Sequence, residues 1–112
     1  YMDDYDILLA PTAAVPPFPV EQLYPTHING EELRSYFHWL GLAYGLTLTS
    51  HPVITIPCGL DATGTPFGLQ ICGRRWGDRR LLAIAAAVES HLKSLPARAR
   101  PYPDIAALSH PD

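Results

Sequence analysis

The fold of this chain is decided by two apolar runs, SHPVITIPCG at residues 50–59 and GTPFGLQI at residues 64–71. Between them stands DATG at residues 61–64, a cluster of turn-forming residues, so the segment is predicted to be a β-hairpin. Gly64 can adopt a positive φ angle at little cost, as such turns often require. Pro52, Pro57 and Pro66 stand at the ends of the runs, where a missing N–H group does not interrupt strand pairing.

The two faces of the second run differ in character. Alternation along a strand places Phe67, Leu69 and Ile71 on one face and Gly68, Gln70 and Cys72 on the other. We expect the first set to contact a helix. The second set is small and includes an amide, so another segment or water is expected to approach it closely. The first run is apolar on both faces, which is typical of a strand covered on both sides.

Two further segments are expected before the hairpin. The run ILL at residues 7–9, stopped by Pro11, is typical of a strand buried on both faces. Residues 10–25 contain five prolines and predict an extended connection along the surface. We interpret this connection as a structural loop in preference to a proline-rich ligand for a partner domain.

A first helix is predicted over residues 29–45. Asn29 is the expected N-cap, Glu31 and Glu32 place negative charge in the first turn, where the helix dipole favours it, and Gly45 is the expected end. Apolar side chains recur along this segment at helical spacing, namely Leu33, Tyr36, Phe37, Leu40, Ala43 and Tyr44.

A second helix is predicted over residues 78–95, with Asp78 as the N-cap acceptor and Pro96 as the stop. Its apolar face consists of Leu81, Ile84, Ala85, Val88, Leu92 and Leu95. The tail from residue 96 to residue 112 is expected to be irregular, with one helical turn at residues 104–108.

These elements define an α/β fold class, a fragment of a mixed β-sheet built from a strand, a helix, a β-hairpin and a C-terminal helix. The strand and loop occupy residues 1–28, the central elements residues 29–95 and the tail residues 96–112. Burying one Leu or Ile contributes about 1.5–3 kcal/mol, while ordering each residue costs about 1–2 kcal/mol. Two helices could cover one face of a three-stranded sheet but hardly both, yet two of the three strands are apolar on both faces. We therefore expect the missing cover to come from sequence outside this chain, which alone should be marginally stable, oligomeric or prone to aggregate.

Bulk properties bound the class of protein. The net charge of −3 gives no basic face for nucleic acid, and no apolar run approaches the roughly 20 residues of a membrane span. The start YMDD lacks the regions of a signal peptide, and the abrupt first strand fits a truncated chain as well as a natural terminus. Two cysteines fall short of a disulfide framework, so we expect a soluble, cytoplasmic protein.

Few side chains form a pattern that suggests chemistry. The five histidines are scattered without metal-ligand spacing, and no phosphate-binding glycine-rich loop occurs, so neither a metal nor another cofactor is expected. Cys58 and Cys72 are interpreted as core thiols. Arginines at positions 74, 75, 79 and 80 surround Trp76, and we interpret them as surface ion-pair partners in preference to a nucleic-acid site.

Three ordered blocks resemble the C-terminal portion of the amidase signature family. DILLAPT at residues 6–12 is similar to a strand that leads into that family's proline-rich loop. TSHPVITIPCG at residues 49–59 resembles its T-G-x-P-A-hydrophobic-S-hydrophobic-P-x-G strand, and GTPFGLQICG at residues 64–73 its G-x-P-hydrophobic-G-hydrophobic-Q motif. Asp78, followed by Leu81 and Leu82, resembles the start of its last long helix, and the match extends to about residue 95. Ser50 departs from the pattern, because glycine is usual there, and so does Thr47, where asparagine is frequent.

The resemblance implies a hydrolase that cleaves carboxamides through an acyl-enzyme, with a serine nucleophile, a second serine in a cis peptide and a lysine base. The Gly/Ser-rich segment that carries both serines in the family has no counterpart here, and Lys93 is expected on the polar side of its helix. We therefore assign no catalytic residue, and we predict this chain alone to be inactive, with the triad upstream.

In the family, this region completes the central sheet and contributes to the walls of the substrate channel. Tyr36, Trp39 and Thr47 are the candidates for such a wall, with plain packing as the alternative for each. The implied partners are the rest of the amidase chain and a small amide substrate. Two other interpretations stay open: the amidase-like subunit of a glutamine-dependent tRNA amidotransferase, and a free-standing binding module without catalysis.

Overall fold

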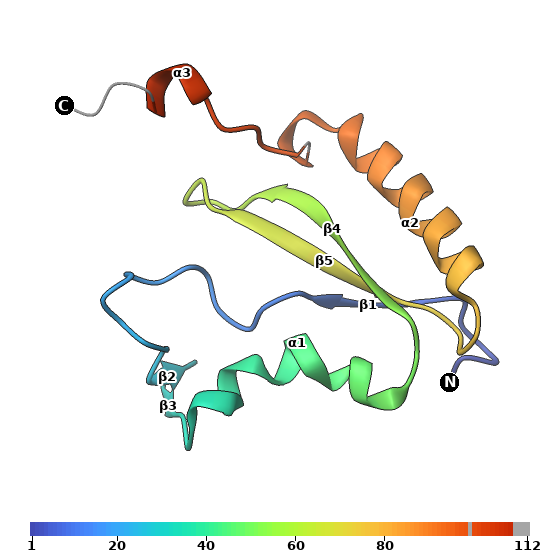
Figure 1. Cartoon of the computed structure of the whole chain (residues 1–112), viewed down its shortest axis with the longest axis horizontal. Coiled ribbons are helices and arrows are strands. Elements are labelled where there is room, and N and C mark those ends of the chain that lie inside the picture. Colours follow the sequence, from blue (N-terminus) through green and yellow to red (C-terminus); the bar gives the residue numbers. More distant parts are fainter. Residues whose placement is uncertain (99, 109–112) are drawn as a thin grey trace.

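A computed structural model describes residues 1–98 and 100–108 (Figure 1). Its centre is an antiparallel three-stranded sheet in the order β1-β5-β4, with β1 at Leu8–Pro11, β4 at Val53–Leu60 and β5 at Pro66–Cys72. Strands β4 and β5 form the expected hairpin, in a register that pairs Ile54 with Ile71. Because β5 is the central strand, both of its edges are hydrogen-bonded.

The hairpin turn is held by one carboxylate. Oδ1 of Asp61 accepts hydrogen bonds from the backbone N–H of Thr63 at 2.8 Å, the hydroxyl of Thr63 at 2.7 Å and the backbone N–H of Thr65 at 2.9 Å. Gly64 has a φ of +82°, which confirms the left-handed position predicted there. The turn is therefore fixed by local hydrogen bonds rather than by packing.

A bulge interrupts β4 before the turn. The pairing register shifts between Pro57 and Leu60, and Gly59 has a φ of +98°. The 3-10 segment η3, Pro96–Arg98, packs so closely on this bulge that a Cβ atom at Gly59 would lie 2.7 Å from the carbonyl oxygen of Ala97. Both the positive φ angle of residue 59 and the close approach of Ala97 therefore require glycine at this position.

Helix α2, Asp78–Lys93, packs on the face of the sheet that was expected to meet a helix. The buried core consists of Ile56, Ile71, Leu81 and Ala85, with Ile7, Ile54, Leu69, Val88 and Leu92 packed against it. The N-cap is Gly77, and no side chain caps the helix, so the prediction of Asp78 as the N-cap is wrong. Asp78 instead lies inside the first turn, where its charge still complements the helix dipole.

The helix predicted over residues 29–45 is wrong in its first part. His27–Ile28 (β2) and Glu31–Glu32 (β3) form a short hairpin across Asn29 and Gly30, whose φ angles are +52° and +82°. Positive φ at both central residues is the geometry that Asn-Gly favours in a two-residue β-turn, and this preference overrides the capping pattern. Helical structure begins with η1 at Tyr36–Leu40 and continues as α1 at Gly41–Gly45 and η2 at Thr47–Thr49.

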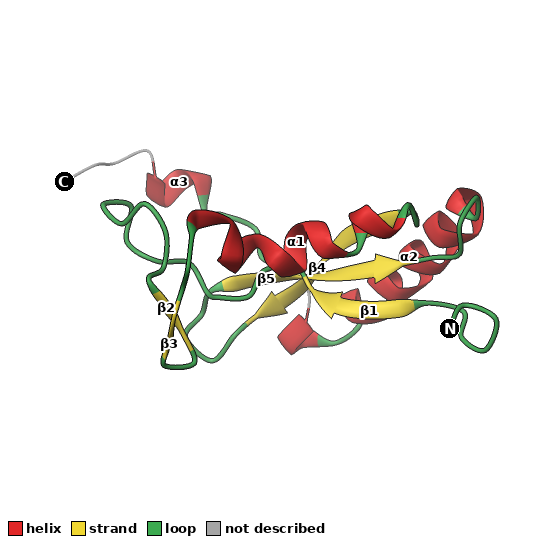
Figure 2. Cartoon of the chain, turned by 90° about the horizontal axis from the view of Figure 1, so that it is seen from below, coloured by secondary structure: helices red, strands yellow, loops and turns green. Residues whose placement is uncertain are grey.

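Strand β1 differs from the expected strand buried on both faces. It lies at the edge of the sheet with alternating half-buried and exposed side chains, and Leu9 is 53% exposed. Leu9 pairs with Ile71 and so belongs to the face that α2 covers, but α2 packs mainly on β4 and β5. Helix α1 lies on the opposite side of the sheet from α2 and contains no buried residue (Figure 2).

The whole chain is extended and flat. Its radius of gyration is 16.7 Å, compared with about 13 Å for a compact domain of this length, and its extents are 54 × 39 × 21 Å. Its accessible surface of 8488 Å² exceeds that of a compact monomer of the same mass by roughly 2,400 Å². Each face of the sheet is covered in part by a helix, and neither face is covered completely. The chain is therefore not a closed globule.

The tail contains the short helix α3 at Ile105–Leu108, within the residues predicted to form a helical turn. Among the described residues, no helix combines the length and the apolar character that crossing a bilayer requires. Residues 109–112 of the predicted irregular tail lie outside the described part of the chain.

Candidate functional site

A groove of about 660 Å³ lies between the proline-rich segment and the end of the hairpin. Its lining consists of residues 11–18, residues 65–68, Trp39 and Asp61. The volume falls within the range of small-molecule sites, about 300–1,000 Å³, and the lining is mainly apolar, as in such sites. The groove thus joins residues 11–18 to residues 65–68, two segments far apart in the sequence.

Gln70 fixes the positions of the two walls that flank this groove. Its side chain is 3% exposed, and its Nε2 donates hydrogen bonds to the carbonyl oxygens of Pro11 and Leu42, both at 2.9 Å. Pro11 opens the proline-rich wall, and Leu42 lies in the helical segment that carries Trp39. The amide on the small face of β5 therefore has the close neighbours that the sequence predicted.

Gly68 permits the proline-rich wall to lie directly on the sheet. The backbone N–H of Thr12 donates to the carbonyl oxygen of Gly68 at 3.3 Å. A Cβ atom at position 68 would lie 2.7 Å from Oγ1 of Thr12, so a side chain there would push the loop away. The glycine sets the depth of the groove at this point.

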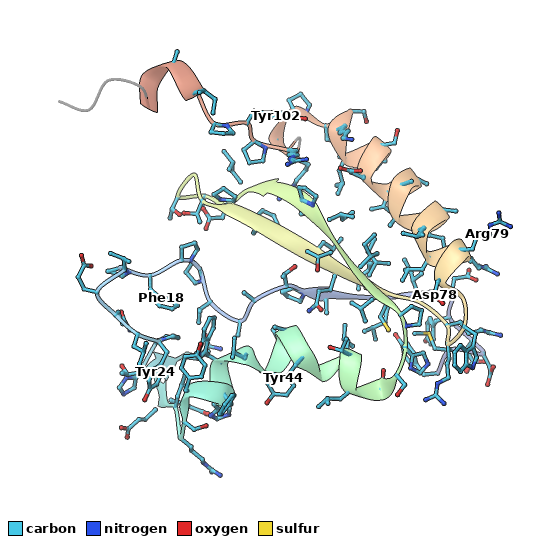
Figure 3. All side chains as sticks on the ribbon, in the orientation of Figure 1. Phe18, Tyr24, Tyr44, Asp78, Arg79 and Tyr102 are labelled. Carbon is cyan, nitrogen blue, oxygen red and sulfur yellow. The ribbon has the colours of Figure 1, made fainter. Side chains whose placement is uncertain are left out.

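An aromatic cluster ties the proline-rich loop to η1. The rings of Phe18 and Trp39 meet edge to face at 5.6 Å, Tyr36 contacts Trp39 at 6.2 Å, and Tyr24 contacts Tyr36 at 5.5 Å. Figure 3 shows Phe18 and Tyr24 on the chain that runs from β1 toward the helical segment. Such pairs add about 0.5–1.5 kcal/mol each beyond burial, so they stabilise the loop in place.

The structure brings together two of the three residues that the sequence suggested for a channel wall. Trp39 lines the groove, and Tyr36 packs on it without lining the groove. Thr47 lies in η2, outside the groove, with its hydroxyl donating to the carbonyl oxygen of Tyr44 at 2.9 Å. Thr12, Phe18 and Phe67 also line the groove, and no site role was predicted for them, although Thr12 lies in DILLAPT and Phe67 in GTPFGLQICG.

Two polar atoms of the lining residues have no hydrogen-bond partner. Within the described residues, Oγ1 of Thr12 and Nε1 of Trp39 are shielded from solvent and unpaired. A buried polar group without a partner costs about 1–3 kcal/mol, so such groups are uncommon in native proteins. Both atoms are able to donate a hydrogen bond.

Asp61 supplies the charge at the rim of the groove. The hydroxyl of Thr63 and then the backbone N–H of Thr65 hold the pKa of the Asp61 carboxyl below its usual value. This carboxylate is already engaged in the hairpin turn, and it lies in solvent. It therefore marks a polar edge of the groove rather than a buried acid or base.

The cysteines and arginines lie apart from the groove lining. Burial raises the pKa of the Cys72 thiol, which keeps it neutral, in agreement with a core thiol. Arg74 pairs with Asp3 at 3.8 Å and Arg80 with Asp6 at 2.5 Å, which confirms the predicted ion pairs for these two arginines of the cluster. Arg75 instead donates a hydrogen bond to the carbonyl oxygen of Thr49 at 3.0 Å. Among the described residues, no three His, Cys, Asp or Glu side chains are grouped to hold a metal.

These features define an α/β protein with an open sheet and a mainly apolar groove. A family model described as Amidase matches residues 1–82, so the chain belongs to the amidase family. It is 40% identical over 91 residues to an acylamidase of Rhodococcus erythropolis and 35% identical over 89 residues to a fatty acid amide hydrolase of Arabidopsis thaliana. It is 30% identical over 90 residues to a glutamyl-tRNA(Gln) amidotransferase subunit from Alkaliphilus metalliredigens.

The matched regions are large parts of this chain and small parts of its relatives. The match to the acylamidase covers 80% of this chain and 19% of the acylamidase. The match to the fatty acid amide hydrolase covers 77% of this chain and 14% of that protein, and the match to the amidotransferase subunit covers 80% of this chain and 17% of the subunit. The chain thus spans at most about a fifth of the length of these curated relatives.

Proposed function

We propose that this chain forms part of the central sheet and one wall of the substrate channel in an amide-hydrolysing enzyme whose nucleophile is supplied by other residues of that enzyme. The observation that carries the proposal is the family match over residues 1–82, combined with relatives named as amide-cleaving enzymes. The surface in excess of a compact monomer supports it, since a sheet inside a larger enzyme requires further cover on both faces.

The catalytic residues are proposed to lie upstream, as a serine nucleophile, a serine in a cis peptide and a lysine base. Lys93 is unsuited to the role of base. Its Nζ pairs with Oε1 of Glu89 at 3.4 Å, and its side chain is 54% exposed. A lysine acts as a base near neutral pH only when desolvation lowers its pKa, whereas solvent and a carboxylate favour its charged form.

Trp39 is the best supported of the proposed wall residues, because it lines the groove. Tyr36 is proposed to act by holding the Trp39 ring. Thr47 remains a candidate for a different part of the channel, since it lies outside this groove. The two free cysteines, Cys58 and Cys72, support a reducing, cytoplasmic location.

The amidotransferase subunit is a second candidate within the same family, favoured by the 30% identity to the protein of Alkaliphilus metalliredigens. It would require a glutamine substrate and a partner protein. The higher identity to the acylamidase favours hydrolysis of a simpler amide. A free-standing, non-catalytic module is less well supported, because its sheet faces would stay half covered.

The test compares two proteins, residues 1–112 alone and the intact protein that contains them. Each is incubated with an anilide substrate and with a fluorophosphonate, which labels activated serines. We expect hydrolysis and labelling in the intact protein and neither in residues 1–112. Hydrolysis by residues 1–112 would show that the nucleophile is within this chain. Absence of both signals from the intact protein, with simple amides and with glutamine, would refute an amidase.

A further inference from the structure

The tail that follows α2 lies against the hairpin, beyond the residues 1–82 that the amidase model matches. Its first segment, η3 at Pro96–Arg98, contacts both β4 and α2 (Figure 1). The backbone N–H of Arg98 donates to the carbonyl oxygen of Leu95 at 2.8 Å, which turns the chain at the end of the helix. The start of the tail is therefore an ordered neighbour of the sheet.

Backbone packing places this segment on the bulge of β4. A Cβ atom at Gly59 would lie 2.7 Å from the carbonyl oxygen of Ala97 and 2.8 Å from Cα of Arg98. Two backbones approach this closely only where one of them carries no side chain. We therefore expect a substitution of the Arg98 side chain to leave the tail in place.

The side chain of Arg98 ends on an aromatic ring that lines the groove. Cζ of Arg98 lies 5.8 Å from the centroid of the Phe67 ring, within the range of a cation–π contact. Phe67 is 38% exposed and lies opposite the bulge, where no described residue of β4 or β1 is paired with it. The position of this ring thus depends on contacts from outside the sheet.

We propose that Arg98 is a positioning residue, which holds the Phe67 ring in one orientation and so raises the affinity of the enzyme for its substrate without taking part in the reaction. The effect on the substrate rests on the proposed function, whereas the contact between the tail and the ring stands independently of it. A cation over the face of an aromatic ring favours that orientation of the ring. A wall that is ordered before the substrate arrives lowers the entropic cost of binding.

The first test uses the intact protein labelled with 4-fluorophenylalanine, and the ¹⁹F signal of Phe67 is assigned by its loss in Phe67→Leu. Arg98→Met keeps an unbranched side chain and removes its charge. Arg100→Met is the matched control, because Arg100 makes the same kind of contact with Tyr102, at 5.5 Å, and neither residue lines the groove. We expect Arg98→Met to shift or broaden the Phe67 signal and Arg100→Met to leave it unchanged.

Hydrolysis of hexanoyl 4-nitroanilide then measures the consequence for the substrate. A cation–π contact at an exposed site changes an equilibrium constant by a factor of about two to five. We expect KM to rise by about this factor in Arg98→Met while kcat is unchanged, because uniform binding is lost. Arg98→Lys keeps a cation and should leave KM close to the wild-type value. In the Phe67→Leu background, Arg98→Met should have no further effect on KM.

The outcomes separate the positioning role from a structural role and from the proposed function. An unchanged Phe67 signal or an unchanged KM in Arg98→Met would overturn the proposal. So would a rise in KM that is equally large in the Phe67→Leu background, or a lower kcat at constant KM, as a loss of folded enzyme would give. Absence of hydrolysis together with a shifted Phe67 signal counts against the proposed function alone.

Discussion

Replacement of Gln70 tests whether one buried amide holds the groove walls in place. Gln70→Leu removes two donated hydrogen bonds of 2.9 Å and leaves the carbonyl oxygens of Pro11 and Leu42 without that partner. A net loss of about 1 kcal/mol per bond, with a further penalty for the unpaired carbonyls, gives roughly 2–4 kcal/mol. The loss should be local to the sheet and its two flanking segments.

Gln70→Glu adds a dependence on pH. An ionised carboxylate accepts but cannot donate, so it repels both carbonyl oxygens, whereas the protonated acid can still donate one hydrogen bond. The carboxyl pKa is therefore expected to rise in the folded state. Stability of this variant is then greatest below the pKa of the unfolded chain and is lost as the pH rises through the folded pKa.

Amide hydrogen exchange of β5 in the intact protein measures both effects, because it reports the local opening free energy. Gln22→Glu is the matched control, since Gln22 is exposed and donates a single hydrogen bond to the carbonyl oxygen of Tyr24. We expect the control to change the opening free energy by less than about 0.5 kcal/mol. Wild-type protection of β5 in Gln70→Leu, or Gln70→Glu with the same pH dependence as wild type, would refute the reasoning.

Three further changes follow from backbone angles and burial. Ser50 has a φ of +60°, so Ser50→Gly should stabilise the chain by about 1 kcal/mol in urea unfolding. The control Ser94→Gly should destabilise the chain, because Ser94 has a φ of −76° and its hydroxyl donates to the carbonyl oxygen of His91. Equal effects of the two substitutions would contradict this. Gly59→Ala should lower the free energy of unfolding by at least about 1–3 kcal/mol, because its Cβ would meet the carbonyl oxygen of Ala97. The control Gly45→Ala has open space around it and should be neutral or stabilising. A neutral Gly59→Ala would contradict this prediction. Burial raises the pKa of the Cys72 thiol, so iodoacetamide at pH 7 should modify half-buried Cys58 first and Cys72 only on unfolding. Mass spectrometry of peptides measures the modification of each cysteine. Rapid modification of Cys72 in the native protein would contradict this.

Local sequence patterns predicted the elements whose signals are strong and agree with one another. The hairpin at residues 53–72 has two apolar runs around turn formers, and α2 has an apolar stripe followed by a proline. The departure at Ser50 also has a physical meaning in the structure, because its left-handed angle explains why glycine suits this position.

Competing local signals caused the main wrong prediction, the start of a helix at residue 29. Asn29 and the two acidic residues that follow fit a helix start, but Asn29-Gly30 fits a two-residue turn better, and the turn formed. The backbone N–H of Leu33 then donates to the carbonyl oxygen of Thr26 at 2.8 Å, which continues the small hairpin and delays the helix.

The groove could not be read from sequence for a different reason. Its walls come from residues 11–18, 39, 61 and 65–68, and only tertiary structure brings them together. Gln70 was the exception: an amide on an otherwise small strand face required a close neighbour, and it has two. Trp39 was a candidate for a channel wall and lines the groove, whereas no role was predicted for Thr12.

The contrast between the two tryptophans of this chain provides an optical tool. Trp76 has a φ of +63° and is 91% exposed, whereas the Trp39 ring packs against Phe18 with its nitrogen shielded. A water-soluble quencher such as iodide should extinguish the emission of Trp76 and spare that of Trp39. Residual fluorescence from residues 1–112 would therefore report whether the proline-rich loop stays packed on Trp39, without any added dye.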